Sequence, residues 1–191
     1  MKIIPKFLSE TWWGNVVLGI LSAAIFYFLI LRILLSTDLP MVAVVSDSMY
    51  HGPNDNYRTL CGVKVDRYQN FTNFWDICKS QYDKFNITKE QFKEFPASNG
   101  FDVGDMPIIR GVDEYKVGDV IVYSTSRVSV PIIHRIVKIN EDNSYQTKGD
   151  NNPGQNPYEL SVAKQNVHGK VIFIIPKLGY FKVMVNKLLG I

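Results

Sequence analysis

The chain has 191 residues, of which 46% are hydrophobic and 13% aromatic, and its formal net charge is +3. This length allows one modest domain with an appendage. The small net charge, and the lack of a basic stripe with interleaved aromatic residues, argue against nucleic acid as a partner. The high aromatic content is compatible with contact at a membrane interface.

Residues 12–31 contain no charged side chain. About twenty apolar residues in a helix suffice to cross a bilayer, so residues 12–35 are predicted to be a transmembrane helix. Trp12 and Trp13 suit one interface, and Arg32 can reach the other with its long side chain. A cleaved signal peptide would have a shorter apolar core followed by small residues, so we expect a retained anchor.

The charges around this helix predict its orientation. Lys2 and Lys6 precede it, which favours a cytoplasmic position for residues 1–11. The protein would then cross the cell membrane once and carry the rest of the chain outside, or in the lumen of the endoplasmic reticulum in a eukaryote. Pro40 ends the helical region. Ser48 follows the helix by about a dozen residues, so its hydroxyl cannot lie far from the membrane.

Residues 41–49 read MVAVVSDSM, an apolar run that ends in a polar break. Such a run suits a strand that ends where a serine is presented. A serine hydroxyl becomes a good nucleophile only when a base takes its proton. Of the three histidines, His134 lies within the apolar run 130–139 and therefore on a strand of the folded domain. We expect His134 to be the base for Ser48.

Other polar residues near these two have competing interpretations. Asp150 lies in a turn of composition GDNN, which can hold a carboxylate against an imidazole. His51 is close to Ser48 in sequence, but a base must approach the hydroxyl from its side-chain face. His168 precedes a strand and is expected to be structural. Arg135 lies on the opposite face of the strand from its neighbour His134, so a packing or ion-pair role is expected.

Five further segments have strand character. Their Val, Ile and Tyr runs are separated by Gly, Asn and Asp, which predicts a mainly β, antiparallel and partly closed domain. Asp119 and Asp142 are expected in turns, and residues 130–139 and 145–148 should form a hairpin. The predicted segments are 104–110, 120–123, 130–139, 145–148 and 171–175.

Residues 52–104 interrupt this domain. Cys61 and Cys78 either form a disulfide, as suits an outward-facing domain, or remain unpaired thiols; without nearby histidines they do not indicate a metal site. One predicted helix presents Phe71, Trp75, Cys78 and Tyr82 on a single face. A second begins with the capping box of Thr88 and Gln91 and the apolar pair Ile87 and Phe92, and ends at Pro96. These aromatic residues either pack the insert onto the β domain or dip into lipid.

Five short sequence motifs together resemble the type I signal peptidases: SDSM, GDVIVY, IIHR, TKGDNN and GKVIFIIPKLGY. A histidine at position 134 resembles their archaeal and endoplasmic-reticulum branch, since the bacterial branch uses lysine as base. The resemblance covers residues 16–180 apart from the insert. It implies a membrane-anchored serine endopeptidase that removes signal peptides from secretory preproteins on the outer or lumenal side of the membrane.

The resemblance also implies roles for individual residues. Ser48 would attack the scissile carbonyl, His134 would act as base and then acid, and Asp150 would orient His134. The Ser48 backbone N–H and the Ser46 hydroxyl would stabilise the oxyanion. The expected pocket walls, which the resemblance implies accept small side chains, are Val42, Val44, Ile132 and Ile133.

The sequence departs from this family at two places. The family has a second aspartate six residues after the first, and here that position is Asn156. Three possibilities stay open: Asp150 acts alone, Glu159 substitutes, or activity is impaired. The proline that usually follows the serine–methionine pair is also missing, where Tyr50 and His51 stand instead.

The organisation expected from the sequence is a cytoplasmic segment 1–11, a helix 12–35, a catalytic β domain 36–51 and 105–180, the insert 52–104 and an amphipathic segment 181–191. The expected partners are secretory preproteins, membrane lipid and the secretion translocon, with no metal and no cofactor. Two rival functions remain: a protease of the same fold with another substrate, and a non-catalytic subunit that binds signal sequences or scaffolds a complex.

Overall fold

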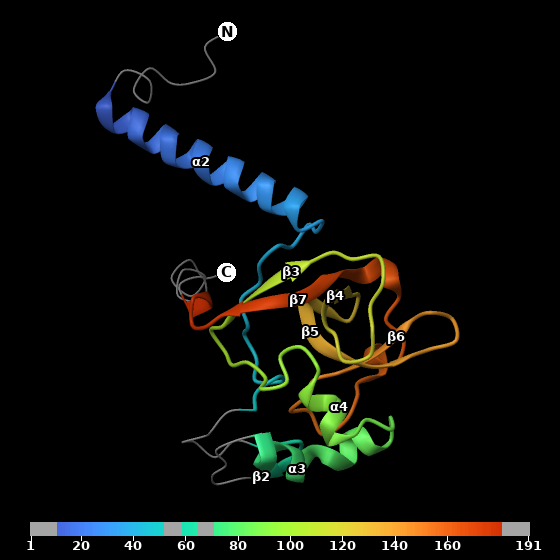
Figure 1. Cartoon of the computed structure of the whole chain (residues 1–191). Coiled ribbons are helices and arrows are strands. Elements are labelled where there is room, and N and C mark those ends of the chain that lie inside the picture. Colours follow the sequence, from blue (N-terminus) through green and yellow to red (C-terminus); the bar gives the residue numbers. More distant parts are fainter. Residues whose placement is uncertain (1–10, 52–58, 65–70, 181–191) are drawn as a thin grey trace.

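The computed structural model describes residues 11–51, 59–64 and 71–180 (Figure 1). The expected segments 1–11 and 181–191 therefore lie outside the described residues, apart from Thr11. The described chain is a long apolar helix, a five-stranded antiparallel sheet and a small unit of short helices and strands. The predicted mainly β, antiparallel class with an N-terminal helix is confirmed.

Helix α2 spans Trp12–Leu34, and its length and apolar composition are sufficient to cross a membrane. It begins at Thr11, whose hydroxyl accepts a hydrogen bond from the Gly14 N–H at 3.1 Å. The only charged side chain in the helix is Arg32. It lies in the last turn, where its positive charge interacts favourably with the negative end of the helix dipole. The helix projects away from the β domain, and no described part of the chain covers its apolar surface (Figure 1).

The sheet has the strand order β3-β7-β4-β5-β6, and every neighbouring pair is antiparallel. The predicted hairpin between β5 and β6 is confirmed. Side chains of the central strand β4 alternate between two apolar clusters, one on each face of the sheet. The strands are β3 (Met106–Arg110), β4 (Val120–Thr125), β5 (Val128–Ile139), β6 (Tyr145–Lys148) and β7 (Val167–Ile175).

The sheet is open, so the expectation of partial closure is wrong. Strands β3 and β6 are its two edges. Residues 40–44 run antiparallel along the outer side of β3, where the Val44 N–H donates to the Asp105 carbonyl at 2.9 Å and the Ile109 N–H donates to the Pro40 carbonyl at 2.9 Å. These bonds occupy the edge of β3 that closure would have required. The same segment leads the chain directly to Ser46.

The described part of the insert consists of short strands and helices. It contains the short strands β1 (Thr59–Leu60) and β2 (Val63–Lys64) and the helices α3 (Phe71–Asp83) and α4 (Lys89–Lys93). Cys61 and Cys78 form a disulfide with Cα atoms 5.5 Å apart, which decides between the two alternatives that the sequence left open. The predicted capping box is confirmed, because Thr88 and Gln91 bond each other's backbone N–H.

The aromatic side chains of the insert belong to a buried cluster that reaches Val137 of β5. Tyr82 and Phe92 are fully buried, and Trp75 is nearly so. The figure places α3 and α4 at the end of the molecule remote from α2 (Figure 1). These three aromatics therefore pack the insert onto the β domain, and the alternative of lipid contact is wrong for them.

Candidate functional site

Ser48 lies in a tight turn that follows the extended segment 40–44. The Tyr50 N–H closes the turn by donating to the Asp47 carbonyl at 3.0 Å. Met49 fixes the turn in the core, since its side chain is almost fully buried and packs with Val44. The Ser48 Oγ lies 3.2 Å from the Ser46 Oγ, so two hydroxyls sit together at the end of the segment.

His134 is buried on strand β5, opposite Ile121 of the neighbouring strand β4. Its Nδ1 lies 2.5 Å from the Oε1 of Glu159. The other carboxylate oxygen of Glu159 accepts from the Asn156 backbone N–H at 2.6 Å and from its side-chain Nδ2 at 2.9 Å. A short 3-10 helix, η1 (Pro157–Glu159), presents this carboxylate to the Nδ1 of the imidazole.

The contacts of Glu159 define the proton positions of the pair. Burial acts to raise the pKa of this carboxyl, but the hydrogen bond and charge of His134, with the donors of Asn156, hold the pKa of Glu159 below its ordinary value. An ionised carboxylate only accepts hydrogen bonds, so the Nδ1 of His134 carries a hydrogen. Whenever the ring is neutral, Nε2 is then the atom with a lone pair, as a general base requires.

One cavity of about 300 Å³ brings Ser48 and His134 together. Its walls come from the segment 43–46, from strand β5 and from the region 152–158. Of the side chains expected to line a substrate pocket, Val44, Ile132 and Ile133 do so, whereas Val42 lies outside it. The lining residues are Ala43, Val44, Val45, Ser46, Ser48, Phe101, Val128, Val130, Pro131, Ile132, Ile133, His134, Asn152, Asn156 and Tyr158.

The loop 149–152 borders the imidazole on the Nε2 side. A methyl group added at Gly149 would lie 2.7 Å from the His134 Nε2 and 2.6 Å from the Asn152 Nδ2. Both distances are shorter than ordinary van der Waals contact, so this position has no room for a side chain. Gly149, the glycine of the GDNN motif, therefore keeps the His134 Nε2 accessible.

Asp150 does not take the expected position beside His134. Its carboxylate accepts from the Arg135 Nη2 at 2.7 Å and Nε at 2.9 Å, and from the Tyr82 hydroxyl at 2.8 Å. Adjacent residues of a strand point to opposite faces, and Asp150 lies on the Arg135 face. The carboxylate on the His134 face is Glu159, the substitution that the sequence left open.

Asp150 is the centre of a fully buried polar cluster. Burial acts to raise the pKa of its carboxyl, but the Arg135 guanidinium and the contact with His51 hold this pKa well below its usual range. The His51 Nε2 lies 3.0 Å from the carboxylate, and its Nδ1 lies 3.0 Å from the Ser98 carbonyl. Burial lowers the pKa of His51. The ion-pair role expected for Arg135 is confirmed, and His51 belongs to this cluster rather than to the serine.

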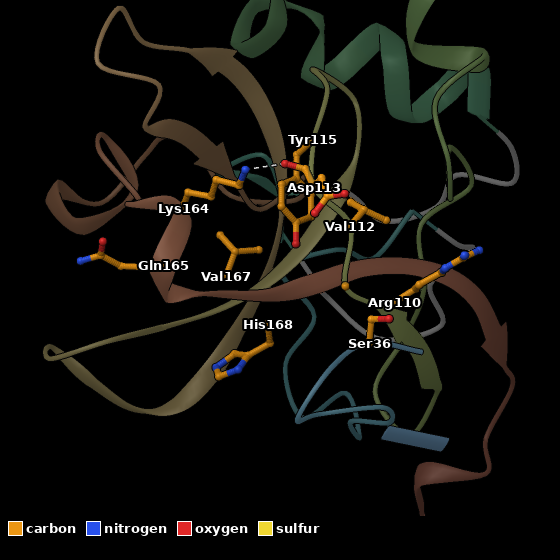
Figure 2. A pocket seen from close by; sticks show the side chains of 10 residues that line it. Ser36, Arg110, Val112, Asp113, Tyr115, Lys164, Gln165, Val167 and His168 are labelled. Atoms are coloured by element: carbon orange, nitrogen blue, oxygen red, sulfur yellow. Dashed lines mark hydrogen bonds between the residues drawn. The ribbon is translucent and has the colours of Figure 1, made fainter. Parts of the chain in front are cut away.

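A larger cavity, of about 810 Å³, lies beside the end of α2 and offers no comparable chemistry (Figure 2). Lys164 donates to the carbonyl of Asp113 at 2.5 Å. His168 is bonded at both ring nitrogens, to Asp38 at 2.9 Å and to Ser124 at 2.7 Å, as its expected structural role requires. Across the described residues, no group of three or more His, Cys, Asp or Glu side chains is arranged to hold a metal ion.

An antiparallel β domain behind an apolar helix, with a serine and a histidine–carboxylate pair around one cavity, has the arrangement expected of a membrane-anchored serine hydrolase. No family model matches the chain. The chain is similar to signal peptidase complex catalytic subunit SEC11 of Eremothecium gossypii, at 35% identity over 99 residues. The same subunit of Lachancea thermotolerans is 33% identical over 99 residues, and that of Komagataella phaffii is 32% identical over 103.

Each of these matches covers 46% of this chain, and the chain covers 59% to 60% of the length of each relative. These similarities agree with the resemblance that the SDSM, IIHR and GDNN motifs indicate. Together they show that the chain is similar to catalytic subunits of signal peptidase complexes.

Proposed function

We propose that this chain is a membrane-anchored serine endopeptidase that removes signal peptides from secretory preproteins. The observation that carries the proposal is a cavity lined by both Ser48 and His134, with Glu159 bound to the Nδ1 of the imidazole. The relatives support it, because all three are catalytic subunits of a signal peptidase complex by name.

The proposed reaction begins when the Ser48 Oγ attacks the carbonyl carbon of the scissile peptide bond. The Nε2 of His134 takes the hydroxyl proton, while its Nδ1 hydrogen stays directed at Glu159. The imidazolium then protonates the departing amine, and the C–N bond breaks. Water attacks the resulting acyl-enzyme with the same base, which releases the carboxylate product and restores Ser48.

The negative charge on the tetrahedral oxygen needs donors that are in place before the reaction. The Ser48 backbone N–H and the Ser46 hydroxyl are the proposed pair, and the two Oγ atoms lie 3.2 Å apart. Loss of one such donor typically lowers kcat by about 10²–10³-fold. Ser46 therefore stabilises the transition state in this proposal, while Ser48 forms the covalent bond.

The substrate would bind as an extended strand. Strand β6 pairs with β5 only from Arg135 onward, so the edge of β5 that precedes it has no strand partner on that side among the described residues. An extended peptide can add to such an edge and direct alternate side chains into the cavity. Val44, Ile132 and Ile133 would contact the side chains that precede the cleaved bond.

The proposed arrangement in the cell is a single membrane span with the β domain outside the cytoplasm. The Gly111 N–H donates to the Leu35 carbonyl at 2.8 Å, and the Thr37 hydroxyl donates to the His168 carbonyl at 2.6 Å. These bonds tie the end of α2 to the β domain and would keep the cavity near the bilayer. A disulfide also suits an extracytoplasmic position. Membrane lipid and the secretion translocon remain proposed partners.

The test is cleavage of a purified preprotein by the full-length chain in detergent, with the cut located by sequencing the new amino terminus. The wild type should cut after the signal peptide, and Ser48→Ala and His134→Ala should not. His168→Ala is the matched control, because it removes a histidine that lines the other cavity and should keep activity. Cutting retained in either of the first two variants would remove that residue from its role.

A further inference from the structure

Asn151 connects the insert to the turn 47–50, which carries Ser48 and is called the nucleophile turn below. Its backbone N–H donates to the Ser48 carbonyl at 2.8 Å, and its side-chain Nδ2 donates to the Asp47 carbonyl at 3.0 Å. On its other side, the Cys61 N–H lies 3.1 Å from both the carbonyl and the Oδ1 of Asn151. The side chain is buried, so water does not compete strongly for these bonds.

The partner on the insert side is covalently fixed. Cys61 is bridged to Cys78 of α3, and its Sγ lies 3.2 Å from the Asp150 carbonyl. The turn that carries Cys61 is also in close contact with the loop, since a methyl group at Gly62 would lie 2.8 Å from the Pro153 side chain. The insert therefore meets the loop 150–153 through backbone, sulfur and apolar contacts together.

Without the disulfide, this contact would depend on a short hairpin and on the packing of Leu60 in the buried cluster of the insert. Strands β1 and β2 have two residues each, and an isolated two-stranded hairpin is marginally stable at best in water. The bridge spans a sequence separation of 17 and joins this hairpin to α3, whose Tyr82 bonds Asp150. Crosslinks of this kind restrict the open conformations of the chain.

We propose that Asn151 is a positioning residue for Ser48, and that the Cys61–Cys78 disulfide of the insert holds Asn151 in place. The inference rests on the proposed function, because its readout is peptide cleavage. A dithiol reductant would break the S–S bond, each sulfur gaining one electron and one proton while the dithiol becomes a disulfide. Reduction would free the hairpin, loosen Asn151 and misplace the serine.

The first experiment replaces the bridge in the full-length chain with the pair Cys61→Ser and Cys78→Ser. A misplacement of about 1 Å at a reacting group can cost about 10²-fold in rate, so kcat should fall by about tenfold or more. KM should change by no more than about twofold, because most of the residues that line the cavity belong to the segment 43–46 and strand β5. Ser80→Ala, on an exposed position of α3, is the matched control and should leave both constants unchanged.

The second experiment adds Asn151→Ala, alone and in the disulfide-free background. If the bridge acts through Asn151, the two changes should be strongly non-additive in kcat, with the triple variant close to Asn151→Ala alone. Additive losses would show two independent structural effects and would overturn the proposal. Circular dichroism and thermal unfolding identify the variants that remain folded.

The outcomes separate this inference from the proposed function. Cleavage by a folded disulfide-free variant at the wild-type kcat overturns the inference and leaves the protease intact. Should the disulfide-free variant fail to fold, Asn151→Ala decides: an unchanged kcat in this folded variant overturns the inference, and a loss at constant KM supports it. Absence of cleavage by the wild type is the failure of the proposed function, and the inference falls with it.

Discussion

At the scale of single residues, the site separates two buried carboxylates into different tasks. Glu159 contacts the imidazole of His134, and Asp150 neutralises the guanidinium of Arg135. His134 and Arg135 are consecutive residues of β5, so their side chains leave the strand on opposite faces. The Asp150 carboxylate forms a bidentate ion pair with Arg135, so it is directed away from the imidazole of His134.

The first prediction concerns Glu159→Gln. A neutral amide can donate to Nδ1 and so place the imidazole hydrogen on Nε2, where it blocks proton uptake from Ser48. We expect kcat to fall by about 10²–10⁴-fold in the preprotein assay. Asp142→Asn, in the hairpin turn, is the control and should retain kcat. A Gln variant within a few-fold of wild type would show that this carboxylate does not orient the base.

The second prediction concerns stability in Asp150→Asn. Removing one partner of a buried ion pair typically costs about 3–5 kcal/mol, because the other charge stays buried and uncompensated. Since the pKa of Asp150 is depressed in the folded state, its contribution is present above the unfolded value, about 4, and is lost as the pH falls towards the folded pKa. The difference from wild type should therefore shrink in acid.

Denaturant unfolding at neutral pH and below about pH 4 measures this difference directly. Asp76→Asn, an exposed aspartate of α3, serves as the control and should unfold like wild type at both values. A gap between Asp150→Asn and wild type that stays constant or widens on acidification would contradict the assigned ionisation.

At the scale of elements, the site depends on how the loop 149–152 meets strand β5 and the nucleophile turn. The Asp150 N–H donates to the sulfur of Met49 at 3.3 Å, and the Asn151 N–H donates to the Ser48 carbonyl at 2.8 Å. The Lys148 ammonium stabilises the loop by donating hydrogen bonds to three of its backbone carbonyls, at 2.8 to 3.2 Å. Burial lowers the pKa of this lysine to about 8. The loop thus contacts the backbone of Ser48 and borders the imidazole of His134.

The third prediction follows from this fit. In Gly149→Ala the added methyl would lie 2.7 Å from the His134 Nε2, so the imidazole or the loop must shift. We expect kcat to fall by about tenfold or more, since displacement of the base disturbs a geometry that catalysis requires. Gly154→Ala is a close match as control, because a methyl there has no neighbour within 4 Å. Equal kcat in the two variants would contradict the proposed contact.

At the scale of the whole molecule, the β domain lies between two dissimilar attachments. Helix α2 extends from one end, and the helices of the insert cover the opposite end (Figure 1). The apolar surface of α2 has no protein cover, whereas the aromatic side chains of the insert are buried against β5. Among the residues that the structure describes, only α2 has an unburied apolar surface of the length that a bilayer accommodates.

The fourth prediction tests this membrane attachment with Leu21→Arg and Ile25→Arg together. An arginine at the centre of a membrane helix costs about 2.5–3.5 kcal/mol on insertion scales, so the pair should release the chain from lipid vesicles during an alkaline wash. The control pair Leu21→Val and Ile25→Val keeps the helix apolar and should remain bound. Equal retention of both double variants would contradict a membrane-spanning role for α2.

Much of the fold could be read from local sequence. The uncharged run that begins at Trp12 forms α2, the Thr88 capping box starts α4, and the hairpin ends where its Asn and Asp residues predicted a turn. Each of these features depends on interactions within a few residues, such as hydrogen bonds of a cap or the alternation of a strand. The sequence alone also indicated His134 as a strand residue and the face on which Arg135 lies.

The identity of the carboxylate at His134 was decided only by the tertiary structure. Asp150 and Glu159 are 16 and 25 residues from His134, and a turn composition says nothing about the face of the sheet to which a side chain returns. The sequence could not predict that the sheet stays open either. That property depends on residues 40–44 pairing with β3, which is distant in sequence. Contacts between distant segments follow from how whole strands pack, which local propensity does not encode.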